Sequence, residues 1–242
     1  MVNVKVTSNE DIWAIKVLNL LSSVQIFLDG GKVAREVPIF GSPFEEDVFL
    51  VGLIDELRFN PDTFSIELWE LKTRKRKCLP SRSQKIQHRL QVMIYQKLFD
   101  DLVKGHLKKE SVAKHLRLRL TAEFGDDVRD KVVDSGFTSK NLCGLMDVLF
   151  EKMQCVTCIQ GLGVEYVHQD SKETIGSELE TYDDGELKAA YKSYLEFWRG
   201  ERKCKGVDIE EAWKCQSCDF DELCDWRKQK AEECSKRNIL NK

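Results

Sequence analysis

The sequence predicts an α/β fold with a C-terminal segment that carries closely spaced cysteines. Three observations lead to this prediction. Residues 49–77 show the apolar runs and turn residues of a β-hairpin. Long amphipathic segments with helix start and stop residues lie before and after this hairpin. Cys215, Cys218 and Cys224 then follow in a C-x2-C-x5-C pattern near the end of the chain.

Length and composition limit the class of protein. The 242 residues suffice for one large domain or for one domain with an appendage, and 42% hydrophobic with 33% charged residues is typical of a globular chain. No run of about 18 apolar residues and no signal peptide is recognised, so neither a membrane span nor a membrane partner is expected. Nine cysteines without a secretory signal favour reduced thiols or metal ligands over disulfides. Because the net charge is −3, nucleic-acid binding would depend on local basic patches.

The first forty residues predict one helix between two strands. Residues 2–6 are consistent with a short strand. Thr7 and Glu10 have the spacing of a capping box, so a helix is expected to begin there and to end near Leu28. Residues 33–40 predict a second strand, in which Pro38 indicates an edge or a strand end.

The hairpin is the centre of the prediction. Residues 49–59 are apolar on both faces, which favours a strand that is covered on both sides. A four-residue loop over residues 60–63 would pair Phe59 with Phe64. In that register Asp55 and Glu70 share one face as diagonal neighbours, about 7–8 Å apart at Cα.

Carboxylates that converge at the end of apolar strands can bind a divalent cation. Asp55 and Glu70 are such a pair, and Mg²⁺ prefers carboxylate oxygens and keeps several waters. The ion would activate water and neutralise phosphate charge, while Lys72 on the same face would stabilise the transition state, as phosphodiester hydrolysis requires. The alternative is an ordinary hairpin with a solvent-exposed Glu70–Lys72 pair. Glu36 is a candidate third carboxylate, although a solvated strand residue is the favoured interpretation of it.

A basic run follows the hairpin and includes Arg74, Lys75 and Arg76. Such a run is commonly a solvated loop or a localisation signal. Because this one comes directly after Lys72, a phosphate-binding role is an equally good interpretation.

The next helix is expected to begin after Pro80, to run to about Lys104 and to end at Gly105. One of its faces carries polar side chains at i, i+4, i+7 and i+11, namely Gln84, His88, Gln91 and Tyr95. Amide, imidazole and phenol groups can bind a phosphate, a base or a water. An ordinary solvated face is the alternative, and it remains the favoured one when this stripe is considered alone.

The second half of the chain predicts further helices and one more hairpin. Helices are expected over residues 110–116, 126–133, 139–153 (capped by Ser139) and 184–198, and strands over residues 118–120, 162–168 and 175–181. Cys155 and Cys158 are interpreted as ordinary thiols because no partner pair follows them. Residues 234–242 are expected to fray.

The three late cysteines predict a metal centre. Zinc and four-iron clusters both usually take four protein ligands, so one ligand is not accounted for locally. Cys204 and Cys234 are near in sequence, but neither completes a familiar spacing.

Taken together, these pieces resemble a known family. The order is a strand ending in Asp55, a strand with Glu70-x-Lys72, a helix with Gln91-x3-Tyr95, and late cysteines. This order resembles the RecB-like branch of the PD-(D/E)XK nucleases, and within it the exonuclease V family. The stretches VGLIDEL, ELKTRKRKCLP, GVEYVHQ and GVDIEEAWKCQSCDFDELCDWRK carry the resemblance, which covers nearly the whole chain.

The resemblance implies a restriction-endonuclease-like core, a mixed sheet flanked by helices, over residues 1–200, with an iron–sulfur segment over residues 201–242. It implies a single-strand-specific DNA exonuclease that acts in repair by Mg²⁺-dependent phosphodiester hydrolysis. Asp55 and Glu70 would bind Mg²⁺, Lys72 would act on the attacking water, and Gln91 and Tyr95 would position DNA or the catalytic groups.

The resemblance also implies ligands, partners and a compartment. Cys215, Cys218 and Cys224 would bind a 4Fe-4S cluster. Arg74, Lys75, Arg76, Gln84 and His88 would lie along bound DNA. The expected partners are single-stranded DNA and, as a further candidate, a single-strand DNA-binding protein. The chain would be a monomer located in the nucleus, with the cytosol as a second compartment.

One departure from the family leaves alternatives open. The family places its first cluster cysteine and a helix with an active-site histidine upstream of the point where this chain begins, so an N-terminally truncated form is expected. The alternatives to an active exonuclease are a non-catalytic product that binds DNA weakly or folds poorly, and a nucleic-acid-binding module with structural zinc.

Overall fold

The computed structural model describes residues 4–45 and 47–240, which fall into two compact units. The first unit comprises Met1–Pro80 and Gln87–Asp183, and the second comprises Ser81–Ile86 and Asp184–Lys242. Each unit is described by itself. The expected boundary between residues 200 and 201 stays a prediction.

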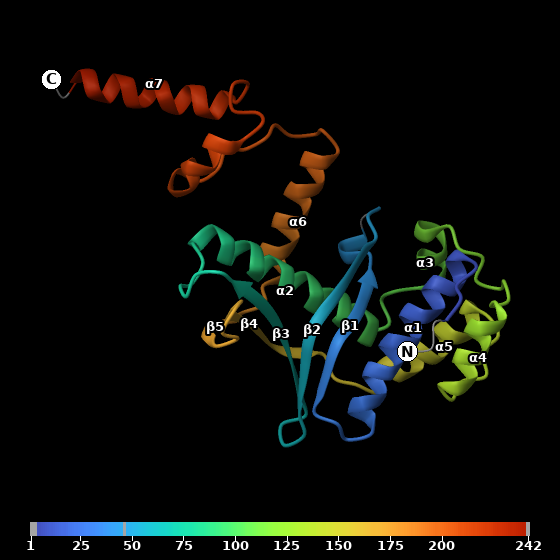
Figure 1. Cartoon of the computed structure of the whole chain (residues 1–242). Helices are drawn as coiled ribbons and strands as arrows, with labels where there is room; N and C mark the ends of the chain where they lie inside the picture. The colour runs from blue at the N-terminus through green and yellow to red at the C-terminus, as the bar shows by residue number, and fades with distance from the viewer. Residues whose placement is uncertain (1–3, 46, 241–242) are drawn as a thin grey trace. The chain divides into compact units, whose positions relative to one another are not determined.

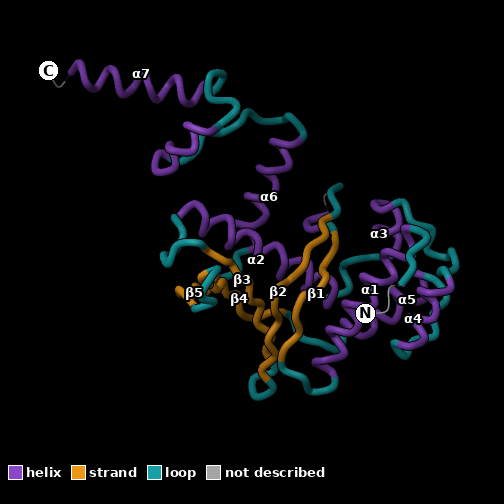
Figure 2. The backbone as a smooth tube through the Cα atoms, in the orientation of Figure 1, coloured by secondary structure: helices purple, strands orange, loops and turns teal. Residues whose placement is uncertain are grey.

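The first unit is built on a five-stranded mixed sheet with the order β1-β2-β3-β4-β5 (Figure 1). Its strands are β1 (Val33–Gly41), β2 (Leu50–Asn60), β3 (Ser65–Arg74), β4 (Ile159–His168) and β5 (Thr174–Glu180). Only β3 and β4 are parallel neighbours; the other three pairs are antiparallel. The long connection between β3 and β4 contains helices, and helices flank the sheet (Figure 2). The predicted α/β class with a mixed sheet is confirmed.

Helix α1 (Asn9–Leu28) packs against β1 and α5. Its N-cap is Ser8, whose side chain accepts a hydrogen bond from the Asp11 amide, so the predicted Thr7–Glu10 capping box is wrong. Thr7 instead donates its amide and hydroxyl groups to Asp11 Oδ2. The helix is long and apolar enough to span a membrane, but half of it is buried in the fold, as a core helix would be.

The predicted N-terminal strand is not found where the structure describes the chain. Residues 4–6 form no strand, and residues 2–3 lie outside the described part.

The hairpin forms in a different register from the one predicted. Phe59 pairs with Ile66 and Asn60 with Ser65, because the loop lies one residue later and Phe64 takes a left-handed conformation with φ 51°. This displacement by two residues preserves the side-chain alternation. It brings Asp55 level with Glu70 instead of Leu68.

The burial of side chains varies along β2. Ile54 and Leu57 are buried, whereas Val51 and Leu53 are 49% and 47% exposed. The prediction that this strand is covered on both faces is therefore wrong for its first half.

Four helices lie between β3 and β4. Helix α2 (Arg82–Val103) ends as predicted before Gly105, which adopts φ 68°. It is followed by α3 (Lys109–Leu116), α4 (Asp126–Asp134) and α5 (Leu142–Met153). The cap of α5 is Asn141 and not Ser139, because the Asn141 side chain accepts the Gly144 amide. Residues 118–120 form no strand; an isolated bridge joins Glu123 to Asn141 instead.

The second unit contains α6 (Asp184–Trp198), a 3-10 segment (Ile209–Ser217) and α7 (Asp225–Leu240). Helix α6 has the predicted bounds and buries Leu187, Tyr191 and Leu195. Residues 234–240 were expected to fray, but they continue α7.

Candidate active site

The candidate site lies where β2 and β3 separate. The last pair of their ladder is Glu56 with Trp69, and the two strands then diverge, β2 alongside β1 and β3 alongside β4 (Figure 1). At this fork Asp55 Oδ2 accepts the backbone N–H of Leu71 at 2.8 Å. The Asp55 side chain thus takes the place of a ladder carbonyl. We define the fork as Asp55 and Glu70 together with the diverging backbones beside them.

Glu70 is a buried carboxylate with one free oxygen. It is only 4% exposed, and its Oε1 accepts hydrogen bonds from Lys72 Nζ and Gln91 Nε2, both at 2.8 Å. Its Oε2 has no hydrogen-bond partner among the described residues. Burial raises the pKa of Glu70 and the charge of Asp55 adds to this, although Lys72 and Gln91 act in the opposite direction. A buried, unpaired carboxylate oxygen beside a second carboxylate is suited to bind a cation.

Helix α2 links the two arms of the fork. Gln91 reaches β3, where its Oε1 accepts a hydrogen bond from Lys72 Nζ at 2.8 Å, and its Nε2 also donates to Tyr95 Oη at 3.3 Å. The Tyr95 ring lies against Gly52 of β2, where a Cβ atom would come within 2.5 Å of the ring. A side chain at position 52 would therefore displace the ring. The four polar groups form one continuous chain from Glu70 to Tyr95.

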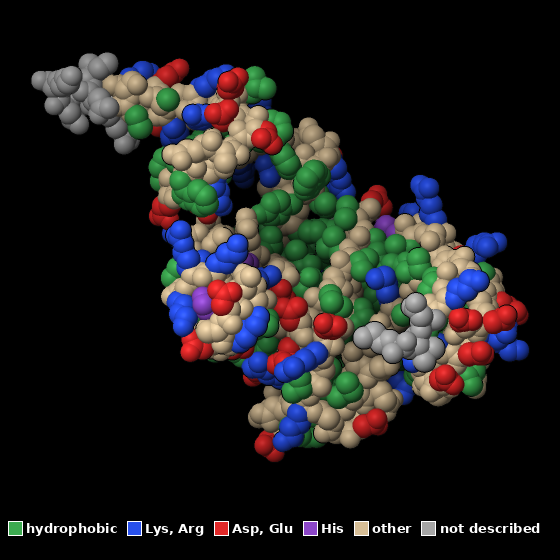
Figure 3. Space-filling view, in the orientation of Figure 1, with side chains coloured by type: hydrophobic (Ala, Val, Ile, Leu, Met, Phe, Trp, Pro, Cys, Tyr) green, Lys and Arg blue, Asp and Glu red, His purple; other side chains and the backbone are tan. Residues whose placement is uncertain are grey.

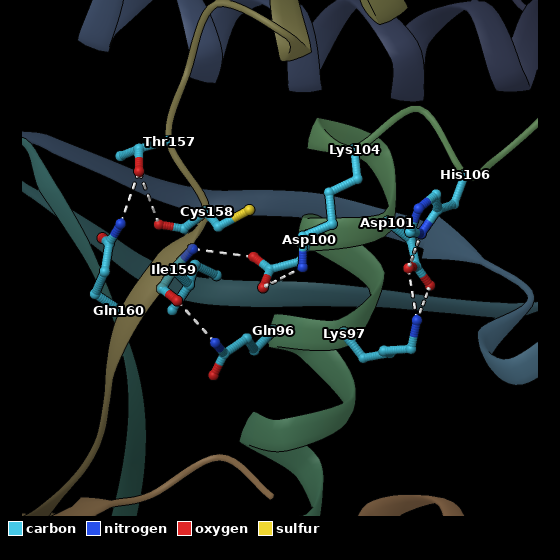
Figure 4. Close-up of polar contacts among 10 residues, drawn as sticks. All are labelled: Gln96, Lys97, Asp100, Asp101, Lys104, His106, Thr157, Cys158, Ile159 and Gln160. Atoms are coloured by element: carbon cyan, nitrogen blue, oxygen red, sulfur yellow. Dashed lines mark hydrogen bonds and ion pairs between the residues drawn. The ribbon is translucent and has the colours of Figure 1, made fainter. Parts of the chain in front are cut away.

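The position of α2 is set at its other end by β4. Gln96 Nε2 donates to the Ile159 carbonyl at 2.7 Å, and the Ile159 amide donates to Asp100 Oδ1 at 3.0 Å (Figure 4). Both polar backbone groups of the first residue of β4 are thus bound by α2. Burial raises the pKa of Asp100, while the Ile159 hydrogen bond opposes this rise. These contacts hold the helix in register with the sheet.

A cavity of about 630 Å³ opens beside the fork. Its lining includes Asp55, Glu70 and the predicted third carboxylate, Glu36. Glu36 has a left-handed backbone with φ 51°, which is unusual for a residue with a side chain and is often found at functional sites. Its role as a ligand stays a prediction.

The sequence interpretation missed other residues of this cavity. Arg35, Glu56, Arg58 and Trp69 also line it. The available signal was the alternation of side chains along three strands, but only strand pairing shows that these residues meet. Acidic and basic side chains lie intermixed over the sheet (Figure 3).

The predicted DNA-binding residues do not all lie at the fork. His88 Nδ1 lies 3.1 Å from the hydroxyl of Tyr166, a residue that pairs with Lys72 across β3 and β4. Burial, followed by the charges of Lys72 and Arg74, lowers the pKa of His88, and burial raises that of Tyr166 to about 12.

The remaining predicted contacts lie elsewhere on the chain. Lys75 and Arg76 are exposed in the loop after β3, and the carbonyl of Arg74 accepts the Gln169 amide. Gln84 belongs to the second unit. The structure therefore brings together the five predicted catalytic residues, and of the predicted DNA-binding set it places His88 and Arg74 nearest to them.

The late cysteines are free thiols that are not gathered. In the part of the chain that the structure describes, no group of three or more His, Cys, Asp or Glu side chains is placed to hold a metal. The assignment of Cys215, Cys218 and Cys224 as cluster ligands stays a prediction.

The fold and the site define a mixed α/β protein whose sheet forks around two carboxylates and a lysine. Comparison with known proteins assigns it further. The family model described as "Exonuclease V - a 5' deoxyribonuclease" matches residues 1–67, 60–141 and 134–227. Exonuclease V of Danio rerio is 39% identical over 232 residues, which is 95% of this chain and 58% of that protein. The chain belongs to the Exonuclease V family.

Two further facts accompany this assignment. The chain spans 58% of the length of the curated relative that it matches. The crystal structure of SSO0001 covers 89% of this chain and 68% of its own, with 15% identity and a TM-score of 0.38, which is too low to assign a fold.

Proposed function

We propose that this chain is a Mg²⁺-dependent exonuclease that hydrolyses phosphodiester bonds of single-stranded DNA during DNA repair, on a PD-(D/E)XK core. The observation that carries the proposal is the buried Glu70 carboxylate, whose Oε2 is unpaired while Oε1 is bound to Lys72 and Gln91. Membership of the Exonuclease V family supports deoxyribonuclease chemistry.

Asp55 and Glu70 would hold the ion, since Mg²⁺ is commonly bound by one or two carboxylates and otherwise keeps water. When bound, the ion supplies Lewis-acid activation of water and charge neutralisation at the phosphate. The cationic ammonium group of Lys72 lies at the same place, with its Nζ 2.8 Å from Glu70 Oε1. It would orient the attacking water and stabilise the negative charge that develops on the phosphate.

Gln91 and Tyr95 act as positioning residues in this proposal. Gln91 holds Lys72 and Glu70 through its two amide atoms, and Tyr95 supports Gln91 from the other arm of the fork. A displacement of about 1 Å in Lys72 or in one of the two carboxylates would greatly lower the rate of hydrolysis. The basic loop of Lys75 and Arg76 would contact the DNA backbone outside the fork.

Further parts of the proposal concern partners, compartment and cofactors. Single-stranded DNA is the proposed partner, with a single-strand DNA-binding protein as a second, and the proposed state is a monomer in the nucleus. A 4Fe-4S cluster at Cys215, Cys218 and Cys224 would require these thiols to move together and a fourth ligand to be supplied. Iron and zinc analysis of purified protein, with Cys218→Ser as the comparison, tests this assignment directly.

The test of the main proposal is a nuclease assay on end-labelled single-stranded DNA with Mg²⁺. It compares the unmodified chain with Asp55→Ala, and with Asp62→Ala as a matched control in the exposed turn of the same hairpin. Degradation by the unmodified chain and by Asp62→Ala, but not by Asp55→Ala, is expected. Absence of degradation by all three would overturn the proposal in favour of a non-catalytic product that binds DNA.

A further inference from the structure

Two arginines on the cavity wall share one carboxylate. Arg35 Nε of β1 donates to Glu56 Oε2 at 2.8 Å, and Arg58 Nε of β2 donates to Glu56 Oε1 at 2.5 Å. Burial alone would raise the pKa of Glu56, but the hydrogen bonds from Arg58 and Arg35 hold it below its usual range. Glu56 is therefore ionised and fixes the orientation of both guanidinium groups through their Nε atoms.

Arg58 is held on a second side by an aromatic ring. Its guanidinium carbon lies 4.4 Å from the centroid of Trp69, which is a cation–π contact. The Trp69 ring also lies close to Gly163 of β4, where a Cβ would meet the ring at 2.5 Å. Glu165 lies 3.8 Å from Arg58 Nη2. The side chain of Arg58 is thus pre-organised by three neighbouring strands.

The terminal nitrogens of these arginines form no hydrogen bond within the described residues, although Arg58 Nη2 makes an ion pair with Glu165 at 3.8 Å. The two side chains are 76% and 40% exposed. A guanidinium that is anchored through Nε keeps its fork of terminal donors for a planar, bidentate anion such as a phosphate.

These donors line the same cavity as the fork. Its lining includes Asp55, Glu56, Trp69 and Glu70 together with the two arginines. The carboxylates at the fork would repel a polyanionic strand. Guanidinium groups that line the same cavity would reduce this repulsion, whereas ion pairs this exposed contribute little to folding stability.

We propose that Arg35 and Arg58, oriented by Glu56 and Trp69, form a phosphate clamp for the DNA backbone beside the fork. The ligand is a backbone phosphate of single-stranded DNA that neighbours the one being cut, so this inference rests on the proposed function. Nothing in the family assignment specifies these residues.

The test measures DNA affinity as a function of salt. Binding of a fluorescent single-stranded oligonucleotide is followed in an Asp55→Asn background, which retains an acceptor for the Leu71 amide and prevents degradation. Arg35→Gln, Arg58→Gln and the double variant are compared with Arg129→Gln, an arginine of similar exposure (43%) that is paired with Asp126 on α4. Each lost phosphate contact should reduce the slope of log affinity against log salt by about 0.7.

The expected result is a reduction in slope of about 0.7 for each single variant and about 1.4 for the double variant. The control should leave the slope unchanged, and Arg58→Lys should retain most of the slope because the slope depends on the number of phosphates that positive charges neutralise. A lower melting temperature with an unchanged slope would show that the arginines only stabilise the sheet, and it would overturn the clamp. A lack of measurable binding would overturn it as well.

The two proposals fail separately. If cleavage requires Asp55 but the salt slope is the same with and without both arginines, the exonuclease proposal holds and the clamp does not. An arginine-dependent slope in a chain that does not cleave would leave the clamp standing as part of a DNA-binding site.

Discussion

The contact between Gly52 and Tyr95 predicts that adding a single methyl group will disturb the fork. In Gly52→Ala the new Cβ would lie 2.5 Å from Tyr95 Cε1, 3.0 Å from Cζ and 3.1 Å from the hydroxyl oxygen. Ordinary carbon contacts are about 3.5–4.0 Å, so the ring or the strand must retreat by about 1 Å. Overpacking of this kind typically costs about 1–3 kcal/mol.

The expected loss of stability can be measured by thermal unfolding. For a chain of this size each kcal/mol lowers the melting temperature by about 2–4 °C. Because Tyr95 supports Gln91, and Gln91 holds Glu70 and Lys72, the proposed nuclease activity should also fall. Gly144→Ala on α5 is a matched control, since its Cβ meets only side chains, the nearest being Ser139 at 3.3 Å, and alanine favours a helix.

A double-mutant cycle isolates the cause. In a Tyr95→Ala background the methyl group meets no ring, so Gly52→Ala should cost less than about 0.5 kcal/mol there. An equal cost in both backgrounds would refute the reasoning, because the penalty would then come from the strand itself. So would an unchanged melting temperature of the single variant.

Four further predictions concern the fork and the helix α2 that supports it. Asp100→Ala should destabilise the chain by about 1–3 kcal/mol in thermal unfolding, because the buried Ile159 amide loses its acceptor. Asp101→Ala should cost less, because the Asp101 carboxylate is paired with the Lys97 side chain and not with a buried amide, and an equal effect would contradict this role. Gln91→Ala should lower the rate of DNA cleavage about 10–100-fold while changing the melting temperature little, since it releases Lys72 and Glu70 from their shared partner; a loss seen only as unfolding would argue against positioning. Because burial raises the pKa of Glu70 above 4.5, its ionisation costs folding stability as pH rises through that pKa, and activity, which needs the ionised form, should fall with acid at a pH above 4.5. Mg²⁺ favours the ionised form, so it should raise the melting temperature more at pH 7 than at pH 4.5; equal shifts at both pH values would exclude Glu70 as the responsive group.

Most helices and strands could be predicted from the sequence because their signals are local. Helix α6 begins and ends at the predicted residues, and α2 ends as expected before a glycine. The errors at the helix starts concern which of several nearby polar residues acts as the cap. Ser8 and Asn141 are the caps instead of Thr7 and Ser139 because their side chains accept the amide three residues further along the chain. Residue types alone do not show which neighbouring side chain has this geometry.

The residues of the site were predicted in part. Alternation along β2 and β3 was sufficient to place Asp55, Glu70 and Lys72 on one side, and this survived the error in register because the displacement was two residues. Glu56, Arg58 and Trp69 were missed, since charged residues in strands are usually solvent-exposed and nothing local shows that they share a cavity with Arg35.

The α/β class, the family and the candidate carboxylate, lysine and amide groups could all be derived from the sequence, because they depend on residue types and short spacings. The separation of β2 and β3 at Asp55, the burial of Glu70 with one unpaired oxygen, and the packing of the Tyr95 ring on Gly52 became visible only in the three-dimensional structure. These features depend on contacts between segments far apart in the chain. Their geometry is set by how the helix packs across two diverging strands, which no local pattern encodes.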